Sequence, residues 1–196
     1  DRYFLFIGSS MPGVVVLEIL HVLTQQSLGL VSDVSGSIHQ VMGIASAGLI
    51  SIVLVLAPRM ARLRVHRYVW SSLSISCATV SSAIILFSGL VPRGAQAPSY
   101  FATVRASFQG AILLTFAGAT IWLVLVLKRG QLSGRGMPDR VGTRFMIGAT
   151  GLLALSQVPE ILACYGYDWH LVIGYLLAGA GLFLIVDGLV YRGLEV

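Results

Sequence analysis

Three carboxylic acids interrupt long apolar segments of the sequence: Glu18, Glu160 and Asp187. A charge near the centre of a bilayer costs on the order of 2.5 to 3.5 kcal/mol, so each acid needs compensation. Asp187 lies five residues before Arg192 and is expected to pair with it, or with other basic residues, on the inner side. Neither glutamate has a Lys or Arg within one turn of its own helix. We therefore expect each to meet an imidazole, a side chain from another helix, a bound cation or a proton.

Three histidines fall at the ends of apolar segments, at what we expect to be one level on the outer side of a membrane. Glu18 and His21 are three residues apart and share a helix face. Imidazoles and carboxylates bind protons and divalent metals, and a histidine can hold haem iron. The sequence predicts an outer cavity for a small cation, proton or polar solute, formed by Glu18, His21, His39, Glu160, Asp168 and His170.

The spacing of these residues does not select a cofactor. There is no CxxC or HExxH motif, and the Glu-x-x-His spacing of Glu18 and His21 has no second copy. A divalent metal or a haem therefore stays open as an alternative, with His21, His39 and His170 as its ligands. The two cysteines, Cys77 and Cys164, are expected at different depths and as free thiols.

A serine-rich segment, residues 71–82, forms the third apolar run. Helical spacing places Ser72, Ser76 and Thr79 on one face. Such hydroxyls can line a hydrated path, or they can bond their own helix or a neighbouring one. Under either interpretation we expect this face to point inward and not toward lipid.

The elements that position these residues follow from composition. The 196 residues are 56% hydrophobic and only 11% charged, which excludes a water-soluble domain. The apolar runs are continuous, so we predict an all-α, polytopic integral membrane protein in which one domain, 1–196, forms a six-helix bundle with short loops. Gly43 with Ala47, and Gly174 with Ala178, have the spacing of closely packed helices. The expected spans are 3–24, 38–58, 68–91, 108–127, 143–164 and 170–191.

Basic residues predict the orientation of the bundle. Under these spans, 11 Lys and Arg residues lie on one side and only Arg93 and Arg105 on the other. The positive-inside rule then places both termini in the cytoplasm or its equivalent, with Arg105 as an outer headgroup anchor. This orientation accounts for the net charge of +5 without a nucleic-acid partner. The chain begins with Asp1, so a preceding segment fits equally well, and we expect residues 3–24 to be a retained helix.

Three classes of function remain open for a multi-pass protein of an unspecified membrane. The first is binding or transport of a small cation, proton or polar solute in the outer cavity, with Asp187 as the candidate for an inner opening. The second is a metal- or haem-dependent enzyme or redox subunit. The third is an accessory subunit whose polar groups meet a partner's helices, in a homo-oligomer or a larger membrane complex. We favour the first, because the glutamates need compensation and no complete catalytic motif is present.

Overall fold

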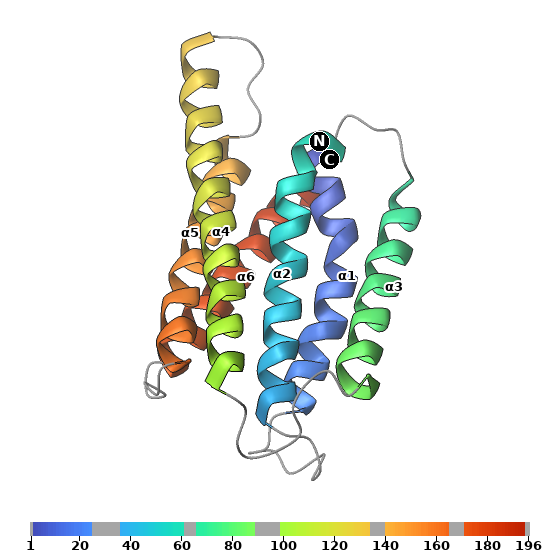
Figure 1. Ribbon diagram of the computed structural model, residues 1–196. Helices are drawn as coiled ribbons and strands as arrows, with labels where there is room; N and C mark the ends of the chain where they lie inside the picture. The colour runs from blue at the N-terminus through green and yellow to red at the C-terminus, as the bar shows by residue number, and fades with distance from the viewer. Residues whose placement is uncertain are drawn as a thin grey trace. The chain divides into compact units, whose positions relative to one another are not determined.

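The computed structural model describes residues 2–24, 36–60, 66–88, 99–133, 140–164 and 171–194. This part of the chain is all-helical and contains six helices, each long and apolar enough to cross a membrane. The prediction of a polytopic six-helix protein is therefore confirmed, whereas its orientation stays a prediction. In chain order (Figure 1) the helices are α1 (Arg2–Leu23), α2 (Gly36–Met60), α3 (Arg67–Phe87), α4 (Ser99–Ser133), α5 (Arg140–Ala163) and α6 (Leu171–Leu194).

The helices form because a bilayer offers the backbone no water, so each peptide group must find its partner within the segment. Five of them lie close to the ranges expected from hydropathy. The exception is α4, which was expected to begin at residue 108 but starts at Ser99 and runs for 35 residues. Arg105 and Gln109 lower the local hydropathy, but both are buried. Arg105, which was expected to precede the span, therefore lies inside the helix.

The chain divides into two compact units, an N-terminal unit (Arg2–Val104) and a C-terminal unit (Arg105–Val196). The expected single domain stays a prediction.

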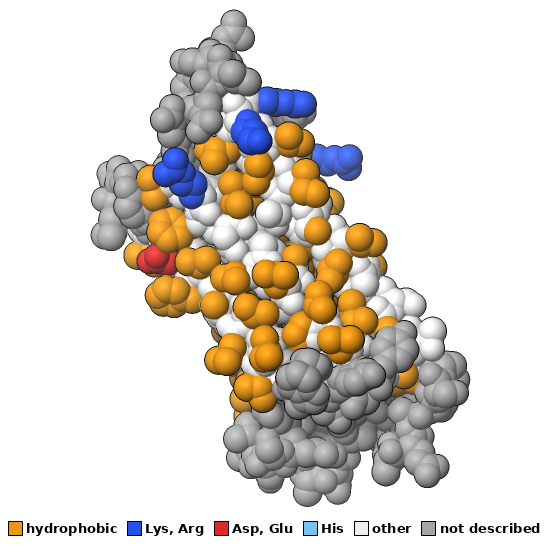
Figure 2. All heavy atoms as spheres, turned by 90° about the vertical axis from the view of Figure 1, so that its left-hand side faces the viewer, with side chains coloured by type: hydrophobic (Ala, Val, Ile, Leu, Met, Phe, Trp, Pro, Cys, Tyr) orange, Lys and Arg blue, Asp and Glu red, His pale blue; other side chains and the backbone are white. Residues whose placement is uncertain are grey.

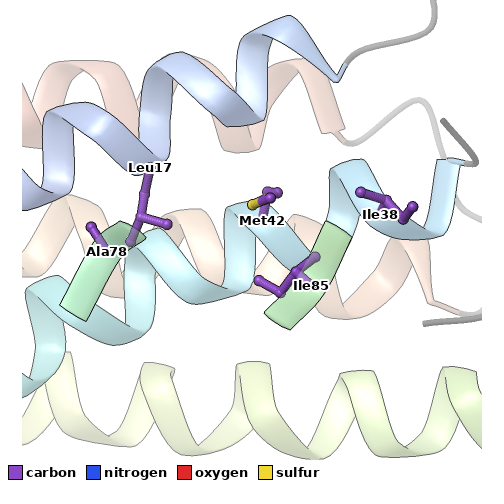
Figure 3. Packing of buried hydrophobic residues seen from close by; sticks show 5 residues of the cluster. All are labelled: Leu17, Ile38, Met42, Ala78 and Ile85. Carbon is purple, nitrogen blue, oxygen red and sulfur yellow. The ribbon is translucent and has the colours of Figure 1, made fainter. Parts of the chain in front are cut away.

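In the N-terminal unit, α1 lies between α2 and α3 (Figure 1). An apolar cluster joins all three helices, and Figure 3 shows its side chains turned toward one another. Because apolar side chains gain nothing by leaving lipid for protein, this cluster stabilises the unit through close packing. Its fully packed members are Leu17 from α1, Ile38 and Met42 from α2, and Ala78 and Ile85 from α3.

Hydroxyl groups bind α3 to α1 near Pro12, where α1 lacks one backbone N–H. Ser71 donates to the carbonyl of Ser9 at 2.8 Å, and Ser74 donates to that of Ser10 at 2.5 Å. Gly13 permits this approach, because a Cβ there would collide with the backbone and hydroxyl of Ser74. The serines of α3 therefore serve first to join two helices.

In the C-terminal unit, glycines spaced seven residues apart on α6 lie against α5. A Cβ on Gly174 would lie 3.3 Å from Pro159, one on Gly181 would lie 2.9 Å from Leu153, and one on Gly188 would lie 3.1 Å from Phe145. A seven-residue spacing keeps one helix face toward a neighbour over several turns. Small residues on that face let the two backbones approach closely, as the sequence predicted for Gly174.

Apolar side chains dominate the outer surface of the protein. Figure 2 shows one face covered mainly by hydrophobic side chains, with Lys and Arg toward one end. Leu114 and Leu176 each expose 70% of their surface, an exposure that suits lipid and not water. Lys128 and Arg129 near the end of α4, and Arg144 near the start of α5, are exposed, as expected for basic residues that flank membrane spans. The protein is a multi-pass integral membrane protein in contact with the bilayer.

Candidate functional site

Two histidines connect the last turn of α1 to the first turns of α2. The rings of His21 and His39 are stacked, with centroids 4.0 Å apart and planes 15° from parallel. The Nδ1 of each ring lies 2.9 Å from the backbone carbonyl oxygen of the other residue. The two residues therefore hold each other in a reciprocal arrangement, in which two of the expected site residues come together.

The hydrogen bonds of the pair define its protonation pattern. A carbonyl oxygen can only accept, so the Nδ1 of each ring must carry the hydrogen. In the neutral form of each imidazole, the lone pair then resides on Nε2.

A carboxylate lies one turn before this pair on α1. Oε1 of Glu18 accepts a hydrogen bond from the Ser46 hydroxyl of α2 at 2.5 Å. Glu18 thus obtains the partner from another helix that its lack of a local cation led us to expect. On α2, Ser46 follows His39 by seven residues, or two turns of the same face. We call the set Glu18, His21, His39 and Ser46 the α1–α2 polar contact.

A second polar group forms in the C-terminal unit around Glu160, where α5 faces α4. Its Oε2 accepts a hydrogen bond from Nε2 of Gln109 at 3.3 Å, and the charge of Arg105 acts on it electrostatically. The Nε of Arg105 donates to Sγ of Cys164 at 2.9 Å, and that thiol donates to Oε1 of Gln109 at 3.2 Å. We call Arg105, Gln109, Glu160 and Cys164 the α4–α5 polar contact.

Arg105 corrects one expectation from the sequence. It was expected to anchor in the outer headgroups, but only 9% of its surface is exposed and its guanidinium lies against α5. The reason is that α4 begins earlier than hydropathy indicated, which places Arg105 within the helix pair. A carboxylate and a thiol on α5 then make burial of the guanidinium tolerable.

The hydroxyl face of α3 also differs from the prediction. Ser72, Ser76 and Thr79 were expected to point inward, but all three are exposed, and the Thr79 hydroxyl bonds its own helix at the Ile75 carbonyl. The packed face of α3 is instead the one that carries Ser74. Gly13 accounts for this orientation of α3, because its lack of a side chain leaves room on α1 for Ser74. A ligand-lining role for the exposed face stays a prediction.

The remaining expected site residues are placed less completely. Asp187 is half-buried on α6, while the side chain of Arg192, together with Asp168 and His170, lies outside the described residues. Among the residues that the structure describes, no three His, Cys, Asp or Glu side chains are grouped to hold a metal ion. A metal bound by His21, His39 and His170 stays a prediction, as does one cavity that joins Glu18 to Glu160.

Comparison with known protein families decides the broader role of the chain. A family model named MASE3, described as a membrane-associated sensor domain, matches residues 1–196. The chain belongs to the MASE3 family. This MASE3 domain is thus a membrane protein with a sensory role, in agreement with its six apolar helices. Searches of curated proteins and of solved structures found no match.

Four residues of the two polar contacts in the MASE3 domain were missed as site residues from the sequence. Ser46 could have been found, because it shares a helix face with His39. Gln109 and Arg105 could have been found as a pair four residues apart, had α4 been extended toward its N-terminus. Cys164 was expected as a free thiol, and the structure places it as the hydrogen-bonding partner of Arg105.

Proposed function

We propose that this MASE3 domain senses a small cation, of which the proton is the simplest, by binding it at the α1–α2 polar contact. The observation that carries the proposal is the reciprocal arrangement of His21 and His39. Sensing requires a ligand that binds two arrangements of the protein with different affinity. A pair of rings that also joins two helices would couple binding at the rings to the way those helices meet.

The chemistry of the contact favours a cation over an anion or an apolar solute. The Nδ1 hydrogens are used by the backbone carbonyls, and Nε2 is the basic atom of each ring. Glu18 adds a carboxylate one turn away, which offsets the cost of a positive charge in an apolar setting. Leu17, which precedes Glu18 on α1, and Met42 on α2 are buried apolar side chains, so the charge would lie near an apolar cluster.

Binding at this place would alter how α1 meets α2. A positive charge on one ring attracts the Glu18 carboxylate, which now accepts from Ser46. It also disfavours a second positive charge on the stacked neighbour, because like charges about 4 Å apart repel by about 4 kcal/mol at an effective dielectric constant near 20. The rings and the carboxylate therefore rearrange on binding, and the two helices shift with them.

Infrared difference spectroscopy on the full chain in lipid nanodiscs tests the proposal. A step from mildly alkaline to mildly acidic pH, and separately the addition of Zn²⁺ as a probe of imidazole and carboxylate donors, should alter carboxylate and imidazole bands. Glu18→Gln should remove the carboxylate change, and His21→Gln should remove most of the imidazole change. Glu160→Gln, in the other unit, is the control for a glutamate outside the site. If Glu18→Gln and His21→Gln respond as the wild type does, the site is elsewhere.

The sequence prediction also included transport, through an outer cavity to which Glu18, His21 and His39 of this contact belong. Proteoliposomes that report proton or metal-ion flux separate the two activities. A domain that binds without carrying gives the spectral response and no flux. A flux that Glu18→Gln abolishes would make the contact part of a transport path, and the proposal of a sensor that only binds would then fail.

A further inference from the structure

The face of α2 that meets the histidine pair carries a residue to which neither the family nor the proposed function assigns a role. We infer that Gly43 is a positioning residue for the α1–α2 polar contact, because its lack of a side chain makes the space that the His21 ring occupies. Its importance for sensing rests on the proposed function, but its effect on the ring follows from geometry alone.

Gly43 follows His39 by one helical turn, so both residues face α1. A Cβ built on Gly43 would lie 2.8 Å from Cε1 of His21 and 3.2 Å from its Nδ1. Real Cβ contacts essentially never fall below 3.0 Å, so the ring would have to move. From the sequence, Gly43 was interpreted as a site where two helices approach closely. In the structure, the group that lies against Gly43 is the ring of His21.

The ring cannot move without losing the pair. Its Nδ1 is committed to the His39 carbonyl, and its face is stacked on the His39 ring. Turning the ring away from a new methyl group breaks the hydrogen bond and the stacking together. His39 then keeps only its own bond from Nδ1 to the His21 backbone carbonyl. One added methyl group at position 43 would therefore displace the His21 ring from the contact.

The same helix provides a matched control. Gly48 is also in the middle of α2, and a Cβ built on it would have nothing within 4 Å. Gly43→Ala and Gly48→Ala make the same chemical change in the same helix. Alanine favours a helix over glycine at both positions, so any loss seen only at position 43 reports the ring and not the helix.

The first measurement is a double-mutant cycle on the full chain, unfolded with sodium dodecyl sulfate in mixed micelles. Gly43→Ala should lower the ratio of folded to unfolded protein about tenfold, which is the usual cost of overpacking. In a His21→Ala background the same substitution should cost nothing, since the ring it strikes is gone. Gly48→Ala should be neutral or stabilising in both backgrounds. An equal loss in both backgrounds at position 43 would overturn the inference.

The second measurement is the nitrogen NMR spectrum of the chain with ¹⁵N-labelled histidine rings, in nanodiscs. The wild type and Gly48→Ala should give hydrogen-bonded Nδ1–H signals for His21 and His39, and Gly43→Ala should lose the signal of His21. Retention of the His21 signal in Gly43→Ala would overturn the inference. If the His21 signal vanishes but the infrared response to protons or Zn²⁺ persists, Gly43 does position the ring and the proposed sensing function is wrong.

Discussion

The guanidinium of Arg105 and the thiol of Cys164 join α4 to the C-terminal end of α5, with Nε and Sγ 2.9 Å apart. Glu160 lies one turn before Cys164, and the Arg105 charge acts on its carboxylate. A buried cation and a half-buried acid on facing helices each reduce the cost of the other. The two charges are therefore expected to be energetically coupled.

Removal of Arg105 alone should be more harmful than removal of both charges. Arg105→Gln leaves the Glu160 carboxylate without its cation, and we expect a loss of about 3 kcal/mol in the free energy of unfolding, the lower end of the cost of breaking a buried pair. The double variant Arg105→Gln, Glu160→Gln should regain part of that loss. Detergent unfolding of the wild type, the two single variants Arg105→Gln and Glu160→Gln, and the double variant measures the loss and the part regained. Simple addition of the two single effects would show that the charges are not coupled.

The hydroxyl of Ser46 should stabilise the N-terminal unit through Glu18. Ser46→Ala removes a hydrogen bond between helices, and such bonds in membranes contribute about 0.6 kcal/mol on average. Ser51→Ala is the control on the same helix, because the Ser51 hydroxyl bonds only its own backbone at Gly48. Unfolding of both variants should rank Ser46→Ala as the more costly. The reverse order would argue that the Glu18 bond adds nothing to stability.

Gly13 should resist any larger residue. A side chain there strikes the backbone of Ser74, which cannot rotate away, so Gly13→Ala should cost about 1 to 3 kcal/mol. Gly118→Ala, at an exposed position of α4 with open space around it, should be neutral or stabilising. Thermal unfolding in detergent compares the two variants. A harmless Gly13→Ala would mean that α1 and α3 are less closely packed than the structure has them.

The predicted orientation can be tested by labelling at two helix ends. In a chain without its native cysteines, Ser88→Cys at the end of α3 should react with a membrane-impermeant maleimide added to intact cells. Arg129→Cys near the end of α4 should react only after the membrane is permeabilised. These outcomes follow because the basic residues are expected on the cytoplasmic side. The opposite pattern would invert the predicted topology.

Hydropathy was sufficient for the helices because the bilayer imposes one solution on any long apolar segment. It also led to the contact of Glu18, His21 and His39, since charges and imidazoles in such segments need partners. Hydropathy did not predict which face of a helix packs against its neighbours. Lipid and protein interior are equally apolar, so the serines of α3 carried no signal to separate the exposed Ser72 from the buried Ser74.

The beginning of α4 was missed for a related reason. Arg105 looked like the boundary of a span because an average over a window penalises a charge wherever it lies. Burial of Arg105 is tolerable because Cys164 and Glu160 interact with it, and these partners can be recognised only from the three-dimensional structure.

The length of α4 has a mechanical consequence. A continuous helix of 35 residues is about 50 Å long, whereas the hydrocarbon layer is only about 30 Å thick. If a continuous helix of that length tilts by a small angle within the bilayer, any end that extends into water is displaced sideways further than the part inside the hydrocarbon layer.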